Sequence, residues 1–166
     1  MACGRKNAGN QIVRALVNSV GQLNFSVIPN GFSANALRVD TTALTAVDDN
    51  EWHFFLIRQK ADGTGPEIYV DGSWAAVTRT VLGTATLDDW WQSFDVAVSI
   101  DAFRLGRSSA TTSPQLVNGE MSHFAIWDSA LSDASVNSLY NSWLGEISYS
   151  TKTIRRKGRR LFSANL

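Results

Sequence analysis

Residues 51–72, EWHFFLIRQKADGTGPEIYVDG, decide the fold expected for the chain. In a strand, successive side chains point to opposite faces of the sheet. Near the start of the run WHFFLIR both faces carry apolar residues, which is typical of a strand covered on both sides. Two glycines and Pro66 then interrupt the run, because glycine reaches positive φ without strain and proline fixes φ. The run IYV resumes it, and Asp71-Gly72 is a dipeptide favoured in tight hairpin turns. This stretch therefore predicts two antiparallel strands facing each other across a turn.

Further short runs along the chain have the alternation expected of strands. In residues 22–28, for example, Leu23, Phe25 and Val27 share one face and polar residues the other, which is typical of a half-buried antiparallel strand. Many short strands separated by turn signals favour a β-sandwich. The runs expected as strands are residues 11–17, 22–28, 36–41, 74–82, 94–99, 102–106 and 120–128.

One helix is expected near the end of the chain. Ser132 can cap its start, Asp133 suits the positive end of the helix dipole, and Gly145 is expected to end it. The chain is therefore predicted to be an all-β antiparallel sandwich with one short C-terminal helix. The apolar face of this helix follows the spacing i, i+3, i+4, i+7: Val136, Leu139, Tyr140 and Trp143.

Length and composition indicate one ordinary globular domain. The chain has 166 residues, of which 44% are hydrophobic and 18% charged. No apolar run is long enough to span a membrane, and the polar N-terminus does not resemble a secretory signal. Cys3 is the single cysteine, so no intrachain disulfide is expected.

The net charge of zero hides a segregation of charge along the chain. Residues 1–150 hold all 15 acidic residues and nine of the 15 basic ones, a formal charge of −6, and residues 151–166 carry +6. We expect a domain over residues 1–148 and a basic tail over residues 149–166 that docks on an acidic partner. The acidic body argues against nucleic acid as that partner. The docking residues expected in the tail are Lys152, Arg155, Arg156, Lys157, Arg159, Arg160, Leu161 and Phe162.

Three sequence pieces resemble a known family. They are WH at the start of a strand followed by IYVDG, then FRLG at residues 103–106, and then GEMSHFAIWD at residues 119–128 followed by ALS. Their order and spacing are similar to the concanavalin A-like jelly rolls, in particular the laminin-G-like and pentraxin-like branch. The resemblance implies a jelly-roll sandwich. Family members usually begin with a further strand or two, whereas only about ten polar residues precede the first strand expected here. Either the sandwich is N-terminally shortened, or a neighbouring chain supplies the missing edge strand.

The resemblance also raises the question of chemistry. Glycosidases of this superfamily need two carboxylates across one sugar bond, and no E-x-D-x-E run of acids along a strand occurs here. His53 and His123 lie within apolar runs, where a histidine is more often a core residue than a catalytic one. We therefore expect no enzymatic activity and name no catalytic residue. Relatives often bind calcium through acidic loops, and the acids that would serve here are Asp48, Asp49, Asp88 and Asp89.

Two adjacent tryptophans, Trp90 and Trp91, stand in a polar loop beside Asp88 and Asp89. They can fold back into the core, anchor a protein interface, or stack on a sugar whose hydroxyls bind the acids. Trp74 has the same three alternatives. The other tryptophans are predicted to lie in the core: Trp52, Trp127 and Trp143.

These observations lead to one expected function and one alternative. We expect a non-enzymatic structural or binding module of a large assembly, with the virion surface as its location, as in a phage capsid decoration, fibre or tail protein. Its partners are expected to be other protein subunits, including copies of itself. The alternative is a lectin-like carbohydrate-binding adhesion domain that is extracellular or on a cell surface and binds a surface glycan.

Overall fold

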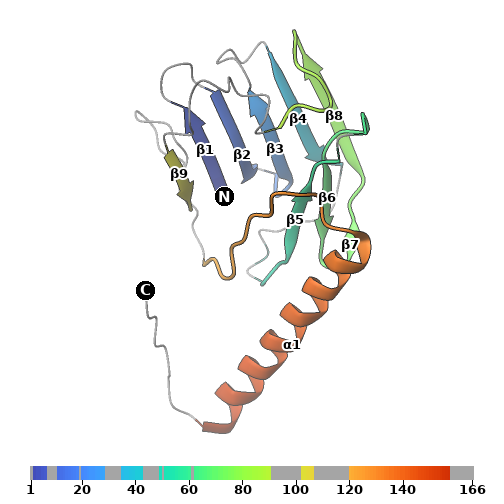
Figure 1. The fold of residues 1–166 in the computed structure, drawn as a ribbon. Helices are drawn as coiled ribbons and strands as arrows, with labels where there is room; N and C mark the ends of the chain where they lie inside the picture. The colour runs from blue at the N-terminus through green and yellow to red at the C-terminus, as the bar shows by residue number, and fades with distance from the viewer. Residues whose placement is uncertain are drawn as a thin grey trace. The chain divides into compact units, whose positions relative to one another are not determined.

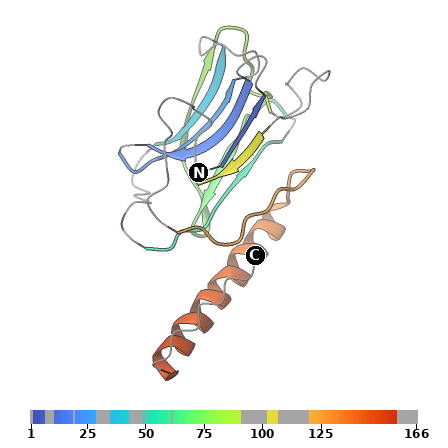
Figure 2. The same cartoon turned by 90° about the vertical axis from the view of Figure 1, so that its left-hand side faces the viewer.

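The computed structural model describes residues 2–6, 11–18, 20–28, 35–42, 49, 51–60, 62–90, 102–106 and 120–157. The chain divides into two compact units, Met1–Ala130 and Leu131–Leu166. The first unit contains two antiparallel sheets, shown in Figure 1 and, turned by 90°, in Figure 2. The larger sheet has six strands in the order β8-β4-β3-β2-β1-β9. Their bounds are β1 Ala2–Lys6, β2 Gln11–Val17, β3 Leu23–Ile28, β4 Ala36–Thr41, β8 Val77–Leu82 and β9 Ala102–Leu105.

The smaller sheet comes from residues 55–74, most of which lie in the stretch EWHFFLIRQKADGTGPEIYVDG. Its strands are β5 (Phe55–Arg58), β6 (Glu67–Val70) and β7 (Ser73–Trp74), in the order β5-β6-β7. β5 and β6 pair antiparallel, as predicted, and the Asp71-Gly72 turn joins β6 to β7. Both turn residues have positive φ, 44° and 98°, which explains the Asp-Gly pair at this position.

The hydrophobic core lies between the two sheets. The larger sheet contributes the alternate residues of β2, β3 and β4, and β6 of the smaller sheet contributes Ile68 and Val70. Register explains the match: Ala15, Phe25 and Val39 are neighbours across three strands, so their side chains share one face. This is the arrangement of a β-sandwich, in which each sheet buries one face against the other.

The hairpin between β2 and β3 shows how the sequence directs a local turn. The Asn18 side-chain oxygen accepts hydrogen bonds from the main-chain N–H groups of Val20 and Gln22, at 3.0 Å each. Gly21 takes a φ of 77°, a conformation that costs glycine no strain. Asn18 and Gly21 therefore set a turn that fixes the register of two core strands.

Most predicted strands are confirmed in the structure. Residues 11–17 and 36–41 form β2 and β4, residues 23–28 form β3, and residues 102–105 form β9. Residues 74–82 are divided between β7 and β8, and residues 94–99 lie outside the described part of the chain. The prediction that the first ten residues precede the sandwich is wrong, because Ala2–Lys6 form β1 and pair with both β2 and β9.

Two further predictions about the C-terminal region are wrong. Residues 120–128 have no strand assigned, and their side chains are exposed. Helix α1 (Asp133–Lys157) has 25 residues and does not end at Gly145. Gly145 has only open space around it and no positive φ, so it is an ordinary helical residue.

The start of α1 agrees with the sequence. The Ser132 hydroxyl accepts a hydrogen bond from the Ser135 N–H at 3.2 Å, so Ser132 caps the helix as expected. The domain boundary expected at residue 148 falls inside α1 and stays a prediction. No described helix is long and apolar enough to cross a membrane.

Candidate functional site

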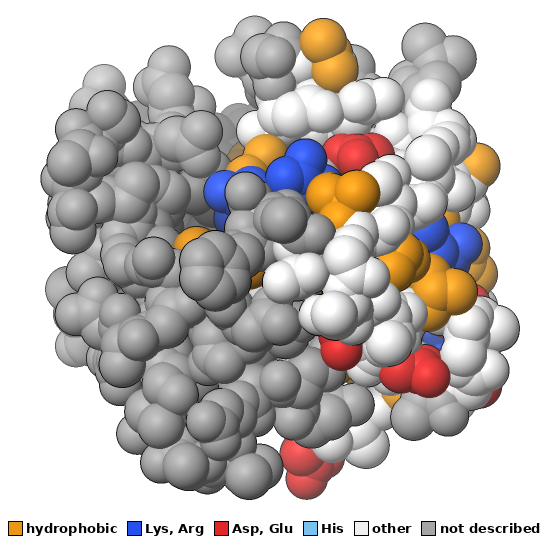
Figure 3. All heavy atoms as spheres, turned by 90° about the horizontal axis from the view of Figure 1, so that it is seen from above, with side chains coloured by type: hydrophobic (Ala, Val, Ile, Leu, Met, Phe, Trp, Pro, Cys, Tyr) orange, Lys and Arg blue, Asp and Glu red, His pale blue; other side chains and the backbone are white. Residues whose placement is uncertain are grey.

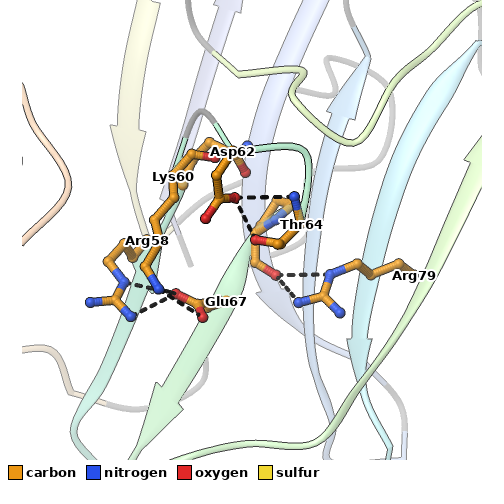
Figure 4. Close-up of polar contacts among 8 residues, drawn as sticks. Arg58, Lys60, Asp62, Thr64, Glu67 and Arg79 are labelled. Atoms are coloured by element: carbon orange, nitrogen blue, oxygen red, sulfur yellow. Dashed lines mark hydrogen bonds and ion pairs between the residues drawn. The ribbon is translucent and has the colours of Figure 1, made fainter. Parts of the chain in front are cut away.

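The outer face of the smaller sheet carries a buried charge network. Arg58 ends β5 with only 4% of its surface exposed, opposite Glu67 at the start of β6. Its Nε and Nη2 atoms lie 2.8 and 2.7 Å from one Glu67 carboxylate oxygen. The Lys60 Nζ atom lies 3.1 Å from the same oxygen. Figure 4 shows both cations directed at Glu67. One carboxylate thus compensates a buried guanidinium and an exposed ammonium.

An aromatic cluster continues this face. The Arg58 guanidinium lies 4.0 Å from the centre of the Trp74 ring, which fits a cation–π contact. Tyr69, 2% exposed, packs edge-on against Trp74 at 5.2 Å and against Phe54 at 6.1 Å. The structure therefore places Trp74 in a packed polar–aromatic cluster, where it is half-buried.

One end of this sheet is held by a histidine between two carboxylates, here called the His53 clamp (His53, Asp49 and Asp71). His53 Nδ1 lies 2.6 Å from Asp71, and Nε2 lies 2.9 Å from Asp49. The other Asp71 oxygen accepts the Phe54 N–H at 2.8 Å. The clamp ties the loop before β5 to the turn after β6. Sequence reasoning missed it, and the only available signal was an aspartate at a turn position that tolerates positive φ.

The clamp changes the ionisation of its members. Partial burial lowers the pKa of His53, but the hydrogen bonds to Asp71 and Asp49 outweigh it, so the net pKa is raised. The hydrogen bond from His53 lowers the pKa of Asp49. Imidazole donates from both nitrogens only when protonated, so the observed geometry fits a histidinium between two carboxylates. His53 is therefore a polar tie with an 18% exposed side chain, and the core role expected for it is wrong.

This geometry predicts a pH dependence of stability. A raised histidine pKa contributes stability that is complete below the unfolded value of about 6.5 and is lost as pH rises through the folded value. The lowered Asp49 pKa contributes stability above about 3.9 that is lost as pH falls through the folded value. As the pH rises from about 5 to about 9, the unfolding midpoint of the wild type is expected to fall. The midpoint of His53→Gln is expected to change much less over the same range.

The chain offers a matched control for this measurement. His123 is the second of its two histidines; its side chain is exposed and contacts the Ser122 hydroxyl at 2.7 Å. His123→Gln is the matched control, because it removes an imidazole that lies outside the His53 clamp. Equal profiles for His53→Gln and the wild type would show that the clamp contributes no pH-dependent stability.

The loop that carries Asp88 and Asp89 is held by hydrogen bonds to its own main chain and to the loop that contains Gly63. Asp88 accepts the Gly63 N–H at 3.0 Å, and Asp89 accepts the Thr86 N–H at 2.8 Å. The Leu87 carbonyl accepts a hydrogen bond from the Gln59 side chain at 3.2 Å. Each acid therefore stabilises a loop at one end of the sandwich.

Trp90 contacts the core. Its ring centre lies 5.0 Å from that of Phe25, which is 2% exposed, and Trp90 is partly buried against the core cluster. Of the three alternatives for this tryptophan, the geometry supports packing in the core. Trp91 lies outside the described residues.

The two sheets are also connected by one long side chain. Arg79 of β8 donates from Nε and Nη2 to the Pro66 carbonyl, at 3.2 and 2.9 Å (Figure 4). Gly65 lies next to the Arg79 side chain, and a Cβ atom at this position would meet Arg79 and Leu87 at 3.1–3.2 Å. The φ of Gly65 is 80°. The glycine in the GTGP turn is therefore required by both space and backbone conformation.

The other tryptophans differ in their surroundings. The core predictions for Trp52 and Trp127 are wrong, since these residues are 46% and 44% exposed, and Trp143 is half-buried on α1. His123 is exposed and is not a core residue. Among the described residues, no group of three or more His, Cys, Asp or Glu side chains is arranged to hold a metal ion, and Asp48 lies outside them.

Two antiparallel sheets that enclose one core, followed by a C-terminal helix, define an antiparallel β-sandwich protein. Residues 2–137 match the family model Laminin_G_3, whose description is the concanavalin A-like lectin/glucanases superfamily, and the chain belongs to this family. The resemblance stated from the sequence is confirmed. Searches of the curated proteins and of the solved structures gave no match.

Proposed function

We propose that this domain is a non-enzymatic binding module of a large protein assembly, with the virion surface as its location. In this proposal the sandwich is the displayed body, and the basic C-terminal region docks on acidic surfaces of neighbouring subunits, including copies of itself. Phage capsid decoration, fibre and tail proteins are the classes of virion component that fit such a module.

The observation that carries this proposal is α1. The helix continues to Lys157, so four of the six basic residues of the C-terminal region lie on a regular helix. Residues 1–150, which come before the basic region, carry a formal charge of −6. A basic helix end on a neighbouring copy is complementary to this charge. Val136 is fully buried on this helix, and Tyr140 and Trp143 stack at 5.8 Å, so α1 also has an aromatic and apolar stripe.

The ionisation of Asp49 and Asp62 is consistent with the non-enzymatic part of the proposal, for these two groups only. A glycosidase needs one carboxylic acid whose pKa is raised so that it can donate a proton. The pKa of Asp49 is lowered by its hydrogen bond from His53, and that of Asp62 by hydrogen bonds from Thr64. Both shifts are opposite to what a general acid requires.

The distribution of charge supports a protein partner over nucleic acid. Figure 3 shows acidic, basic and hydrophobic side chains interspersed over the coloured part of one face. A phosphate backbone is usually bound by a continuous basic patch or stripe. The described part of this face offers a mixed surface, which is more typical of a protein contact.

The proposal is tested by the mass of the chain in solution. Light scattering at low salt on the full chain and on a version that ends at Ser150 compares assembly with and without the basic residues. The full chain is expected to have the larger mass, because the truncated chain keeps the body charge of −6 and loses +6. Equal masses would contradict docking between copies through this region.

One observation favours carbohydrate binding as a second candidate function. Trp52 is 46% exposed and directly precedes His53, whose carboxylate partners bring polar groups to this end of the sheet. An exposed aromatic ring beside polar groups can stack on a sugar while those groups bind its hydroxyls. In this alternative the sugar site is at Trp52 and not at Trp90, because Trp90 packs on the core.

A further inference from the structure

A line of polar residues crosses the outer face of the larger sheet, here called the arginine row (Arg14, Ser26, Arg38 and Thr80). Register joins Arg14 of β2 to Ser26 of β3, and Ser26 to Arg38 of β4. Arg38 is joined in turn to Thr80 of β8, so the row crosses four neighbouring strands (Figure 1). The residues next to Arg14, Ser26 and Arg38 along their strands belong to the core, so these three side chains lie on the opposite face.

Arg38 has a donor that lacks an acceptor. Its side chain is half-buried, and its Nε atom is buried with no hydrogen-bond partner among the described residues. Asp40 lies on the same face of β4, but its carboxylate accepts a hydrogen bond from Asn24 Nδ2 at 2.7 Å. A buried donor without an acceptor costs free energy, because its hydration is lost and not replaced. The Arg38 guanidinium is therefore suited to an acceptor that comes from outside the described chain.

The neighbours of Arg38 form the surroundings of such an acceptor. Arg14 is half-buried two strands away, at a Cα–Cα distance of about 10 Å from the usual strand spacing, so two long side chains can reach one ligand. Ser26 lies between them, 1% exposed, and its hydroxyl donates to Asn24 Oδ1 at 2.8 Å. Thr80 on the other side of Arg38 is exposed, so the row is open to solvent at β8.

The charges of this face indicate which ligand fits. A planar carboxylate matches the fork of a guanidinium and can accept two parallel hydrogen bonds from it. Asp40 lies two residues from Arg38, about 7 Å along β4, and disfavours a doubly charged group such as phosphate. Residues 1–150 carry a formal charge of −6, which repels an extended polyanion. A small ligand with a single negative charge is therefore favoured.

We propose that the arginine row binds the carboxylate group of a small ligand. Arg38 donates from Nε and one Nη atom to the two carboxylate oxygens, and Arg14 adds a second positive charge. The Thr80 hydroxyl, at the open side of the row, is available to a polar group on the rest of the ligand. This site uses neither α1 nor Trp52, so its failure leaves the proposed function and the sugar site at Trp52 unaffected.

The test is the binding of two carboxylate probes to the full chain. Acetate carries the carboxylate alone, and glucuronate carries it on a sugar ring. Glucose controls for the sugar hydroxyls, and sodium chloride controls for ionic strength. Nuclear magnetic resonance shifts of the main-chain amides in isotope-labelled protein give both the Kd and the place of binding.

Three variants make the test specific. Arg38→Gln removes the guanidinium and keeps a polar side chain. Arg38→Lys keeps the charge without the fork, so it tests the site even if Arg38→Gln does not fold. Lys60→Gln is the matched control, because it removes a cation whose side chain is 39% exposed on the smaller sheet.

In the wild type and in Lys60→Gln, acetate and glucuronate are expected to shift the amides of Ser26, Arg38 and Thr80, and glucose and sodium chloride are not. A lower Kd for glucuronate would assign the carboxylate to an acidic sugar, and equal Kd values would assign it to a simple carboxylic acid. Arg38→Gln is expected to raise the Kd roughly tenfold or more, and Arg38→Lys is expected to raise it less. The proposal would be overturned if neither acid shifted these amides in the wild type, or if both Arg38 variants kept the wild-type Kd.

Discussion

Glu67→Ala is expected to lower the free energy of unfolding by about 3 kcal/mol, because it removes the carboxylate from a buried guanidinium. Arg58 is 4% exposed, and two of its nitrogens lie within 2.8 Å of one Glu67 oxygen. Stacking on Trp74 at 4.0 Å remains after the substitution but does not neutralise the charge. Urea denaturation followed by tryptophan fluorescence measures this loss.

The second cation on the same carboxylate provides the control. Lys60 contacts Glu67 at 3.1 Å, but its side chain is 39% exposed and its charge stays solvated when the partner is absent. Lys60→Ala is therefore expected to change stability by less than about 1 kcal/mol. Similar losses for Glu67→Ala and Lys60→Ala would mean that burial of Arg58 does not set the energetics of this network.

Trp90→Ala is expected to lower the free energy of unfolding by about 2–3 kcal/mol. The ring is partly buried against the core cluster and lies 5.0 Å from the ring of Phe25, so its removal leaves a cavity at one end of the sandwich. The loss is smaller than for a completely buried tryptophan because Trp90 is only partly buried. Thermal or urea denaturation measures it.

Trp90→Ala also separates a packing role of this tryptophan from a sugar-binding role, and Asp89→Ala is its control. Asp89→Ala removes the neighbouring acid and one loop hydrogen bond while Trp90 is kept, so it is expected to destabilise the fold by only about 1 kcal/mol. If Trp90→Ala kept wild-type stability but abolished binding to a glycan array, Trp90 would be a ligand residue and its packing role would be refuted.

Alternation of apolar side chains predicted most of the sandwich because it records which face of a strand is buried. Phe25 and Val39 are examples: each lies on the apolar face of its run and contributes to the core. The same reasoning missed β1, since ACGRK has no apolar alternation and its pairing with β9 depends on residues far along the chain. Alternation also overestimated residues 120–128, because it indicates a preference for a strand but not the presence of a neighbouring edge.

The polar contacts of the site could be predicted less well. His53 and Asp71 are 18 positions apart, and only the β5–β6 pairing brings them within 2.6 Å. Asp88 and Gly63 are 25 positions apart and meet through the packing of two loops. The helix was underestimated for a different reason: Gly145 lowers helix propensity by about 1 kcal/mol relative to alanine, but this does not suffice to end a long helix.

The measurement that tests the central claim most directly is the solution mass of the full chain with neutral side chains at the end of α1. Arg155→Gln, Arg156→Gln and Lys157→Gln together remove three charges from the helix and retain residues of similar helix propensity. At low salt the wild type is expected to have the larger mass, and raising the salt is expected to bring its mass down to that of the variant. An equal mass for wild type and variant at low salt would contradict a module that docks between subunits through its basic helix.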